Sequence, residues 1–251
     1  MLQYDVYRPE QGTSEAGQAL SRMLAEESPG KSYADAMRAR VSGALAEECT
    51  DNYFVAHEHG ACVSRLWYGW GTHKDSIGNF GNFLTLESHR GQGIGTRLLG
   101  MWYADLQGRT DLPLGLFCTS APRAARMYEQ YGMHPITDGA TYGPSYMPLG
   151  DSPESFSQFC EQYYTPADYL IARPASFAYR HEIDCLLKFA LLARGESFFG
   201  IGDIPSAEHA ILYAPERAHM LFTESGRCVG WSADEQTQTH PQYSHCKIEF
   251  T

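Results

Sequence analysis

The sequence lacks the features that would place it in a membrane or in a nucleic-acid complex. It has no apolar run of about 18 residues, the length that a membrane-spanning helix needs. Its first residues, Met1 to Asp5, carry an acid where a secretory signal would have a basic flank. The formal net charge is −11 and no basic stripe is present. Neither a membrane nor a nucleic acid is therefore expected as a partner.

Cysteine usage argues against a stapled or metal-bound scaffold. The seven cysteines are an odd number and contain no C-x-x-C pair, so neither a disulfide framework nor a structural zinc site is expected. We accordingly expect no metal site and a cytoplasmic location. With 251 residues and 43% apolar content, the chain has room for one large domain or two smaller ones, with a buried core.

A glycine-rich stretch is the most informative feature that is present. It reads Arg90, Gly91, Gln92, Gly93, Ile94, Gly95 and Thr96. An apolar, strand-like run at 82–86 precedes it, and a helical series with apolar residues four apart follows over 94–106. A strand that turns through glycines into a helix leaves backbone N–H groups pointing one way at the positive end of the helix dipole. The stretch therefore predicts a phosphate site.

Three glycine-rich fingerprints compete for this stretch. A Walker loop would continue with Lys and Ser or Thr, whereas Thr96 and Arg97 follow Gly95. The dinucleotide fingerprint G-x-G-x-x-G is not met, because the three glycines are spaced by two throughout. The pattern R/Q-x-x-G-x-G is met by Arg90, Gly93 and Gly95. It resembles the coenzyme A pyrophosphate loop of the GNAT acetyltransferase superfamily.

A second motif downstream strengthens this resemblance. Residues 120–133 read as a helix, with Pro122 in its first turn. The segment is similar to the family pattern N-x-x-A-x-x-L-Y-x-x-x-G-F. The positions that match it are Ala124, Met127, Tyr128, Gly132 and Met133. The family asparagine falls on Ala121, so its contact with the pantetheine arm would have to come from Ser120 or Thr119.

The order of the predicted elements agrees with the family. We predict a strand at 2–8, helices at about 14–27 and 33–49, and a hairpin over 53–68, followed by the strand that ends at Leu86. A strand at 114–118, the helix at 120–133 and closing strands near 133–149 complete the order. The resemblance implies an α/β (α+β) fold, in which a central mixed, mostly antiparallel sheet is flanked by helices.

The C-terminal part repeats the beginning of the chain. Residues 169–174 echo residues 4–9 at an offset of 169 − 4 = 165, and residues 221–229 echo residues 54–63 with a glycine offset of 226 − 60 = 166. Two echoes at nearly one offset indicate a duplicated unit. We therefore predict a GNAT domain at 1–150, a connector at 151–168 and a partial GNAT-like domain at 169–251 without a coenzyme A loop.

The resemblance also implies a mechanism, in which an amine attacks the thioester of acetyl-CoA directly. Pantetheine would pair with the strand that contains Leu84, Thr85 and Leu86, and residues 90–96 would take the pyrophosphate, with Ser120 and Arg123 as further cofactor contacts. Tyr128 matches the family tyrosine that protonates the leaving thiolate. Glu87, at the end of the strand, is the candidate base, and a solvated turn carboxylate is its alternative.

Other residues allow more than one interpretation. Cys118 ends a predicted strand near the expected thioester, and a small buried filler is favoured over an acyl-cysteine. Tyr68 and Trp70 are candidates for an acceptor pocket or for stacking on a cation. The predicted substrate is a small-molecule amine, with a peptide N-terminus as an option. The C-terminal half would cover the acceptor site or form an interface, such as that of a homodimer. A non-catalytic acyl-CoA sensor or scaffold is the alternative function.

Overall fold

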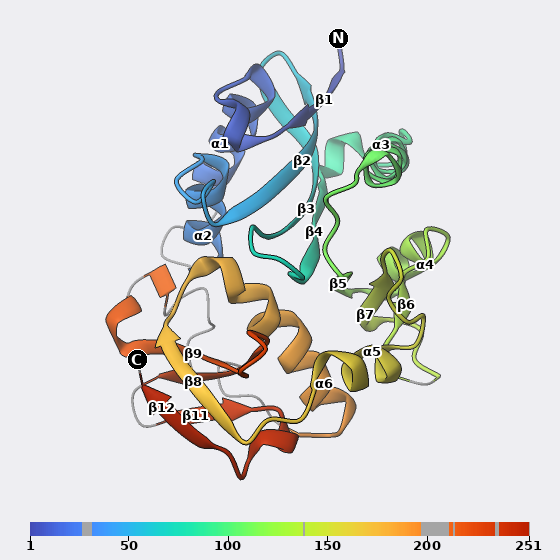
Figure 1. Cartoon of the computed structure of the whole chain (residues 1–251). Coiled ribbons are helices and arrows are strands. Elements are labelled where there is room, and N and C mark those ends of the chain that lie inside the picture. The colour runs from blue at the N-terminus through green and yellow to red at the C-terminus, as the bar shows by residue number, and fades with distance from the viewer. Residues whose placement is uncertain (27–31, 138, 197–210, 213, 234–235, 251) are drawn as a thin grey trace. The chain divides into compact units, whose positions relative to one another are not determined.

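The computed structural model describes residues 1–26, 32–137, 139–196, 211–212, 214–233 and 236–250. The chain forms two compact units (Figure 1). Unit 1 comprises Met1–Thr72 and Asn79–Leu112, and unit 2 comprises His73–Gly78 and Pro113–Thr251. This division follows packing and differs from the predicted limits at 150 and 168. Those limits concern a unit of sequence and stay a prediction.

Unit 1 contains a four-stranded sheet between two layers of helices. Its elements are β1 (Gln3–Tyr7), η1 (Pro9–Gln11), α1 (Glu15–Glu26), α2 (Ser32–Val41), β2 (Cys49–Glu58), β3 (Ala61–Gly71), β4 (Gly78–Thr85), η2 (Glu87–His89) and α3 (Ile94–Gly108). The strands lie in the order β1-β2-β3-β4, and β2 pairs antiparallel with both β1 and β3. Helices α1 and α2 cover one face of this sheet and α3 covers the other (Figure 1).

Alternation along the strands explains both helix layers. Tyr53 and Val55 of β2 pack with Leu20 and Leu24 of α1 in one apolar cluster. Successive side chains of a strand point to opposite faces, so Phe54 faces away from that cluster and stacks on Tyr68 of β3 with ring centroids 6.0 Å apart. The sheet of unit 1 is therefore buried on both faces.

Helix α2 is shorter than the sequence pattern predicts. We predicted a helix over 33–49, but α2 ends at Val41 and Cys49 already begins β2. Gly43 has a φ of 80°, a left-handed conformation that commonly ends helices. The apolar and acidic residues at 44–48 have a spacing that is also typical of a helix. The prediction of a helix over 42–49 was therefore wrong.

The first part of unit 2 contains a small antiparallel sheet. Its elements are β5 (Gly115–Ser120), α4 (Pro122–Glu129), β6 (His134–Pro135), β7 (Gly143–Pro148) and α5 (Phe156–Tyr163). β7 pairs antiparallel with β5 and with β6. The predicted strand at 114–118, helix at 120–133 and closing strands are thus present, although α4 ends at Glu129.

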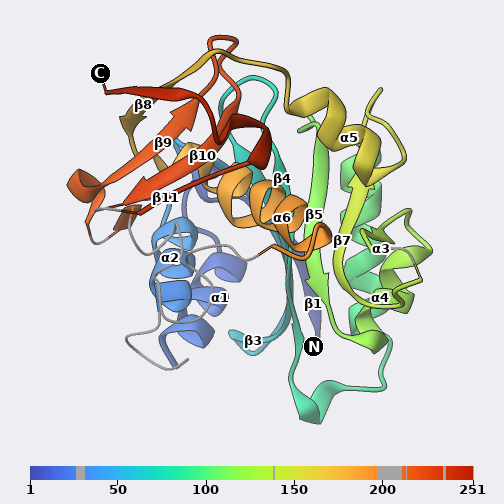
Figure 2. The ribbon, with the colours of Figure 1, turned by 90° about the horizontal axis from the view of Figure 1, so that it is seen from below.

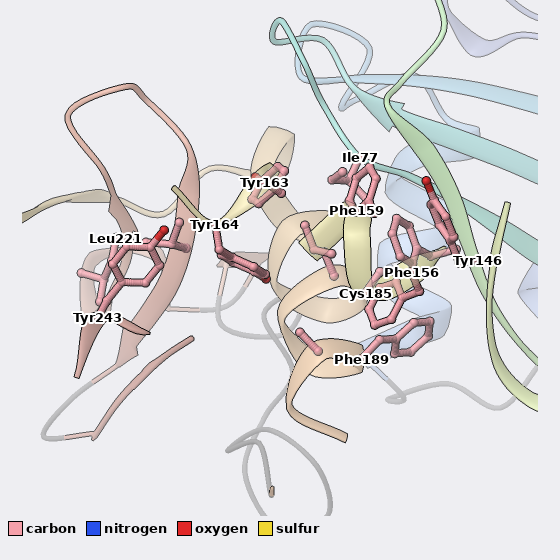
Figure 3. Close-up of a cluster of buried hydrophobic side chains, with 14 of the residues drawn as sticks. Ile77, Tyr146, Phe156, Phe159, Tyr163, Tyr164, Cys185, Phe189, Leu221 and Tyr243 are labelled. Carbon is pink, nitrogen blue, oxygen red and sulfur yellow. The ribbon is translucent and has the colours of Figure 1, made fainter. Parts of the chain in front are cut away.

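The segment that we predicted as a connector, 151–168, is part of a core. Phe156, Phe159 and Tyr163 of α5 are buried, and Phe159 lies 5.0 Å from Tyr146 and 5.9 Å from Phe117 between ring centroids. Figure 3 shows the rings of Tyr146, Phe156, Phe159 and Tyr163 together with that of Phe189. The acidic residues of the segment suggested a solvated linker, but its aromatic residues recur on one helical face and bury it.

A second sheet fills the rest of unit 2. Its elements are β8 (Tyr169–Pro174), η3 (Phe177–Tyr179), the π-helical turn η4 (Glu182–Leu187), α6 (Lys188–Ala193), η5 (Pro215–Arg217), β9 (Ala218–Phe222), β10 (Cys228–Ala233), β11 (Gln236–Thr239), η6 (Pro241–Tyr243) and β12 (Lys247–Phe250). The strand order is β11-β10-β9-β8-β12, and β12 runs parallel to β8. The η4–α6 helix lies against this sheet (Figure 2) through Ile183, Leu187 and Leu191.

The two sheets share a local pattern. In each, a first strand is followed by helical structure and then by an antiparallel meander, β1–β4 in unit 1 and β8–β11 in unit 2. The register between the second and third strands shifts at Val63 and at Val229, each preceded by cysteine. The carbonyl of Val63 accepts the Leu86 N–H at 2.9 Å, and that of Val229 accepts the His240 N–H at 3.1 Å. The register shifts and these two hydrogen bonds are similarities between the two segments that the sequence echoes did not include.

Within the described residues, no helix is long and apolar enough to cross a membrane.

Candidate functional site

The glycine stretch forms an exposed turn that leads into α3. Gly91 and Gly93 both have a φ of 76°, and Gly93 is the residue that precedes the first helical turn. Left-handed φ values in this order bend the backbone so that successive N–H groups face the same side. A Cβ at either glycine would have no atom within 4 Å. The concave side of the turn is therefore open for a ligand.

The start of α3 is suited to an anion. Gly93 provides no side-chain cap, and the first turn of the helix contains no acidic residue. The first N–H groups of a helix have no partner inside the helix and lie at the positive end of its dipole. Ile94 is buried and anchors this turn in the apolar interior. The start of α3 is therefore compatible with the predicted phosphate site.

Gly95 serves packing and not the turn itself. A Cβ on Gly95 would lie 2.8 Å from Cζ of Phe83 and 3.7 Å from Oγ1 of Thr85. Only glycine lets the first turn of α3 approach β4 this closely. The glycines of the motif therefore divide into two that shape an open turn and one that seats the helix on the strand.

The end of β4 is held by side-chain and backbone hydrogen bonds. The Ser64 hydroxyl donates to the carbonyl of Leu84 at 2.8 Å and lies 2.8 Å from Oγ1 of Thr85. Nε of Arg90 donates to the carbonyl of Thr85 at 3.1 Å. Leu86 keeps 38% of its surface exposed. The predicted cofactor residues 84–96 thus lie in one continuous stretch of unit 1, tied together by Ser64 and Arg90.

Asn82 is a feature of this strand that the sequence reasoning missed. Its φ is 55°, left-handed for a residue inside a strand. Such values are uncommon outside glycine, although asparagine tolerates them better than most residues. The side-chain amide of Asn82 contacts the sulfur of Met37 at 3.1 Å. The dipeptide Gly81-Asn82 within an apolar run was the signal that could have indicated this interruption.

Tyr128 lies in unit 2, on α4. Its side chain is 5% exposed. Burial, followed by the neighbouring Cys118 thiol, raises the pKa of Tyr128 above its usual value. Burial likewise raises the pKa of Cys118, whose Sγ lies 2.8 Å from the sulfur of Met133. Tyr128 is thus protonated at neutral pH, and Cys118 is a buried neutral thiol, as the filler interpretation requires.

Other predicted contacts of the cofactor also lie around α4. Ser120 is buried at the end of β5, and its hydroxyl donates to the carbonyl of Gly143 at 3.4 Å. Arg123 is exposed in the first turn of α4. Ala121, at the position of the family asparagine, provides no side-chain cap for this helix. The hydroxyl of Ser120 is therefore directed to the protein backbone.

Glu87 lies at the start of the short turn η2, between β4 and the glycine loop, and is exposed. Its carbonyl accepts the Arg90 N–H at 3.2 Å. The structure thus places this carboxylate next to the phosphate turn in the same surface segment. Its role as a base stays a prediction.

The aromatic residues Tyr68 and Trp70 belong to a buried network. The Tyr68 hydroxyl donates to Asp105 of α3 at 2.5 Å, and the guanidinium of Arg109 lies 4.9 Å from the Trp70 ring. Asn52 accepts hydrogen bonds from Arg109 and from Arg8. The expectation of an acceptor pocket finds no support at these two residues, because both are buried and the Tyr68 hydroxyl already donates to Asp105. The stacking partner that we expected for Trp70 is a cation of the chain itself.

Among the residues that the structure describes, no group of three or more His, Cys, Asp or Glu side chains is arranged to hold a metal ion. All seven cysteines are free thiols.

Comparison with known proteins shows a similarity to a known family over residues 49–133. Residues 49–133 match the family model described as an acetyltransferase (GNAT) domain. This stretch contains both the glycine loop and Tyr128. No curated protein matches the chain.

Solved structures of GNAT enzymes are similar over about three fifths of the chain. An acyl-CoA N-acyltransferase from Pseudomonas aeruginosa is 14% identical, and the match covers 59% of this chain and 99% of that chain with a TM-score of 0.42. A GNAT family acetyltransferase from Brucella melitensis in complex with acetyl-CoA is 18% identical, with 62% and 93% covered and a TM-score of 0.41. These likenesses are weak, so the similarity to GNAT proteins depends on the match to residues 49–133. Residues 49–133, which include the glycine loop, are thus similar to a GNAT acetyltransferase domain.

Proposed function

We propose that this protein is an acetyl-CoA-dependent N-acetyltransferase that transfers the acetyl group to a primary amine of a small molecule. The observation that carries the proposal is the open turn at Gly91 and Gly93, before a helix start without a cap, inside a GNAT domain. This turn would take the pyrophosphate of coenzyme A. The adenine end and the acetyl end of the cofactor would then extend in opposite directions from it.

The acyl end would lie along β4. An extended pantetheine arm has amide groups that can pair with a strand as an additional strand does. We propose Leu84, Thr85, Leu86 and Glu87 for this pairing, with Ser120 and Arg123 as further contacts. The hydrogen bonds from Ser64 and Arg90 would hold the strand in position before the cofactor arrives.

The reaction needs a base and an acid but no protein nucleophile. The amine nitrogen attacks the thioester carbonyl, the C–S bond breaks, and the proton of the ammonium passes to a base. We propose Glu87 as this base, directly or through water. Tyr128 would donate a hydrogen bond or a proton to the leaving sulfur. Because burial raises the pKa of its phenol, Tyr128 keeps its proton until the thiolate forms and then donates a hydrogen bond or the proton to it.

The C-terminal half would be a second, partial copy of the same unit. The support is the shared order of β1–β4 and β8–β11, together with the register shifts at Val63 and Val229. Where a glycine turn follows Leu86 in the first copy, Pro241 follows His240 in the second. Proline has no N–H to donate. We therefore propose that the second copy binds no coenzyme A.

A thiol-release assay with acetyl-CoA and a panel of small amines tests this function. Release of free thiol that depends on the amine is the expected result. Binding of acetyl-CoA without turnover for any amine would favour the sensor function, for which Ala121 in place of the family asparagine is the supporting observation. A chain that does not retain coenzyme A at all would contradict both functions.

A further inference from the structure

The turn between β3 and β4 packs in unit 2. The chain leaves unit 1 after Thr72, contributes residues 73–78 to unit 2, and returns to unit 1 at Asn79. Gly78 is already the first residue of β4. The strand that leads to the glycine loop therefore begins at a segment held by the C-terminal half of the chain. We name residues 73–78 the β3–β4 turn.

A fully buried carboxylate holds this turn. Glu182 has no exposed surface and lies in the π-helical turn η4. Its Oε1 lies 3.0 Å from Nε2 of His73 and accepts the Ile77 N–H at 3.0 Å. The His73 ring also stacks on Tyr179, with centroids 4.1 Å apart. π-helical turns are rare and frequently mark functional positions. A buried carboxylate without partners would be strongly unfavourable, so these contacts are needed to place it here.

Several ionisable groups near Glu182 are tyrosines and cysteines that burial keeps neutral. They comprise Tyr163, Tyr164, Tyr179, Cys185 and Cys228, and burial raises the pKa of each of them. Arg227 lies 3.4 Å from the carboxylate of Asp75 and covers the ring of Tyr163 at 5.0 Å. Lys74, beside His73 in the turn, is exposed. Nε2 of His73 lies at ion-pair distance from Glu182, and Arg180, His181 and Asp184 are further charged or titratable groups beside Glu182 on the same segment.

The charge of His73 depends on this contact. Burial disfavours the imidazolium, but the Glu182 carboxylate stabilises it, and the pKa of His73 is raised above its ordinary value. A raised folded-state pKa means that the interaction is fully present below the unfolded pKa, near 6.5, and is lost as the pH rises through the folded pKa. The contact is therefore strongest at acidic to neutral pH.

We propose that His73 and Glu182 act as positioning residues for the cofactor site, by fastening the turn from which β4 begins. The inference depends on the proposed function, because its consequence is an effect on acetyl-CoA binding. Losing the contact would free the start of β4 and thereby loosen the strand that leads to the glycine loop. Two side chains outside the cofactor motifs would then control cofactor affinity in a pH-dependent manner.

The test uses the full chain with three substitutions. H73F keeps a ring on Tyr179 but removes the donor, H73Q can donate a hydrogen bond but does not titrate, and E182Q removes the negative charge while keeping an acceptor for Ile77. R194Q is the matched control, because it breaks an exposed ion pair of the same unit, Arg194–Glu196. Circular dichroism establishes which variants fold.

Two readouts are measured between pH 6 and 9, namely the hydrogen-exchange protection of the Ile77 amide and the dissociation constant of acetyl-CoA. We expect H73F to lower the protection and to weaken binding on the order of tenfold. The affinity of the wild type for acetyl-CoA should weaken as the pH rises. The affinity of H73Q should not change with pH. If H73F folds and binds acetyl-CoA as tightly as wild type, or if H73Q keeps the wild-type pH slope, the proposal is overturned. If H73F does not fold, the same measurements on H73Q and E182Q still test the proposal.

The two readouts separate this inference from the proposed function. If wild type does not bind acetyl-CoA, the proposed function fails and the effect on binding fails with it. The Ile77 amide then still reports whether His73 fastens the turn. If the Ile77 amide is protected equally in wild type, H73F and E182Q, the His73–Glu182 contact does not hold the turn, whatever the protein binds.

Discussion

Tyr128 combines two properties that bear on its proposed role. Its side chain is almost fully buried. The pKa of its phenol is raised above the ordinary value of 10, because the charged form would be poorly solvated. A thiolate, with a thiol pKa near 8.5, is a weaker base than this phenolate. Complete proton transfer would therefore be uphill, and a hydrogen bond to the departing sulfur is the main contribution that we expect.

We predict that Tyr128→Phe lowers kcat by about 10²-fold, at the lower end of general-acid effects, while KM for acetyl-CoA changes little. Steady-state thiol release measures both parameters. Tyr131→Phe, two residues beyond the end of α4, serves as the control and should retain wild-type turnover. Turnover by Tyr128→Phe at the wild-type rate would remove the assignment of the acid.

We predict that Gly93→Ala weakens acetyl-CoA binding by at least about tenfold while the protein still folds. The left-handed φ costs about 1–2 kcal/mol for a residue with a Cβ, but no protein atom lies within 4 Å of the added methyl. The methyl would instead occupy the space proposed for the pyrophosphate. Calorimetric titration gives the affinity, and urea unfolding gives the free energy of unfolding.

Gly100→Ala is the matched control for this substitution. Gly100 lies on the exposed side of α3 and has open space around its Cα. Alanine there should raise the free energy of unfolding by up to about 1 kcal/mol and leave binding unchanged. Equal affinities of the Gly93→Ala and Gly100→Ala variants would argue against an anion site at the turn.

At the scale of elements, the seating of α3 on β4 separates stability from binding. In Gly95→Ala the new Cβ would lie 2.8 Å from Phe83, so the helix or the ring must move. We predict a loss of about 1–3 kcal/mol in the free energy of unfolding, typical of overpacking. Urea unfolding measures it. A Gly95→Ala variant as stable as wild type would show that α3 shifts without cost.

Helix α5 tests whether 151–168 belongs to a core. Phe159 contacts Phe117, Tyr146 and Tyr163. Truncation of a buried phenylalanine leaves a cavity, and we predict that Phe159→Ala lowers the free energy of unfolding by about 3–5 kcal/mol. Phe250→Ala is the control, because Phe250 is 66% exposed and should change little. A Phe159→Ala variant that unfolds like Phe250→Ala would show that α5 adds little to the core.

For the whole molecule, the proposed repeat gives a binding stoichiometry. Strand β4 continues into a turn with two left-handed glycines, whereas β11 continues into His240 and Pro241, the start of η6. We predict one acetyl-CoA per chain in a calorimetric titration. Gly93→Ala should reduce all of the measured binding. A second site that persists in this variant would contradict the assignment of the C-terminal copy as empty.

Features that depend on local periodicity were accessible from the sequence. The strand at 82–86, the glycine turn and the helix after it follow from side-chain pattern and from the freedom of glycine at positive φ. The order of elements around them agrees with the structure apart from the ends of α2 and α4. Asn82 escaped prediction because its left-handed conformation depends on its surroundings and not on a repeating pattern.

The sequence by itself thus determined the glycine turn, the similarity of residues 49–133 to a GNAT domain and the place of Tyr128 on a helix. Only the tertiary structure decided that α5 joins a core and that Tyr68 and Trp70 contact other residues of the chain. It also decided that Glu182 contacts the β3–β4 turn. The physical reason is the distance along the chain. Ile77 and Glu182 are 105 positions apart, and a partner so remote leaves no periodic or local signal in either segment.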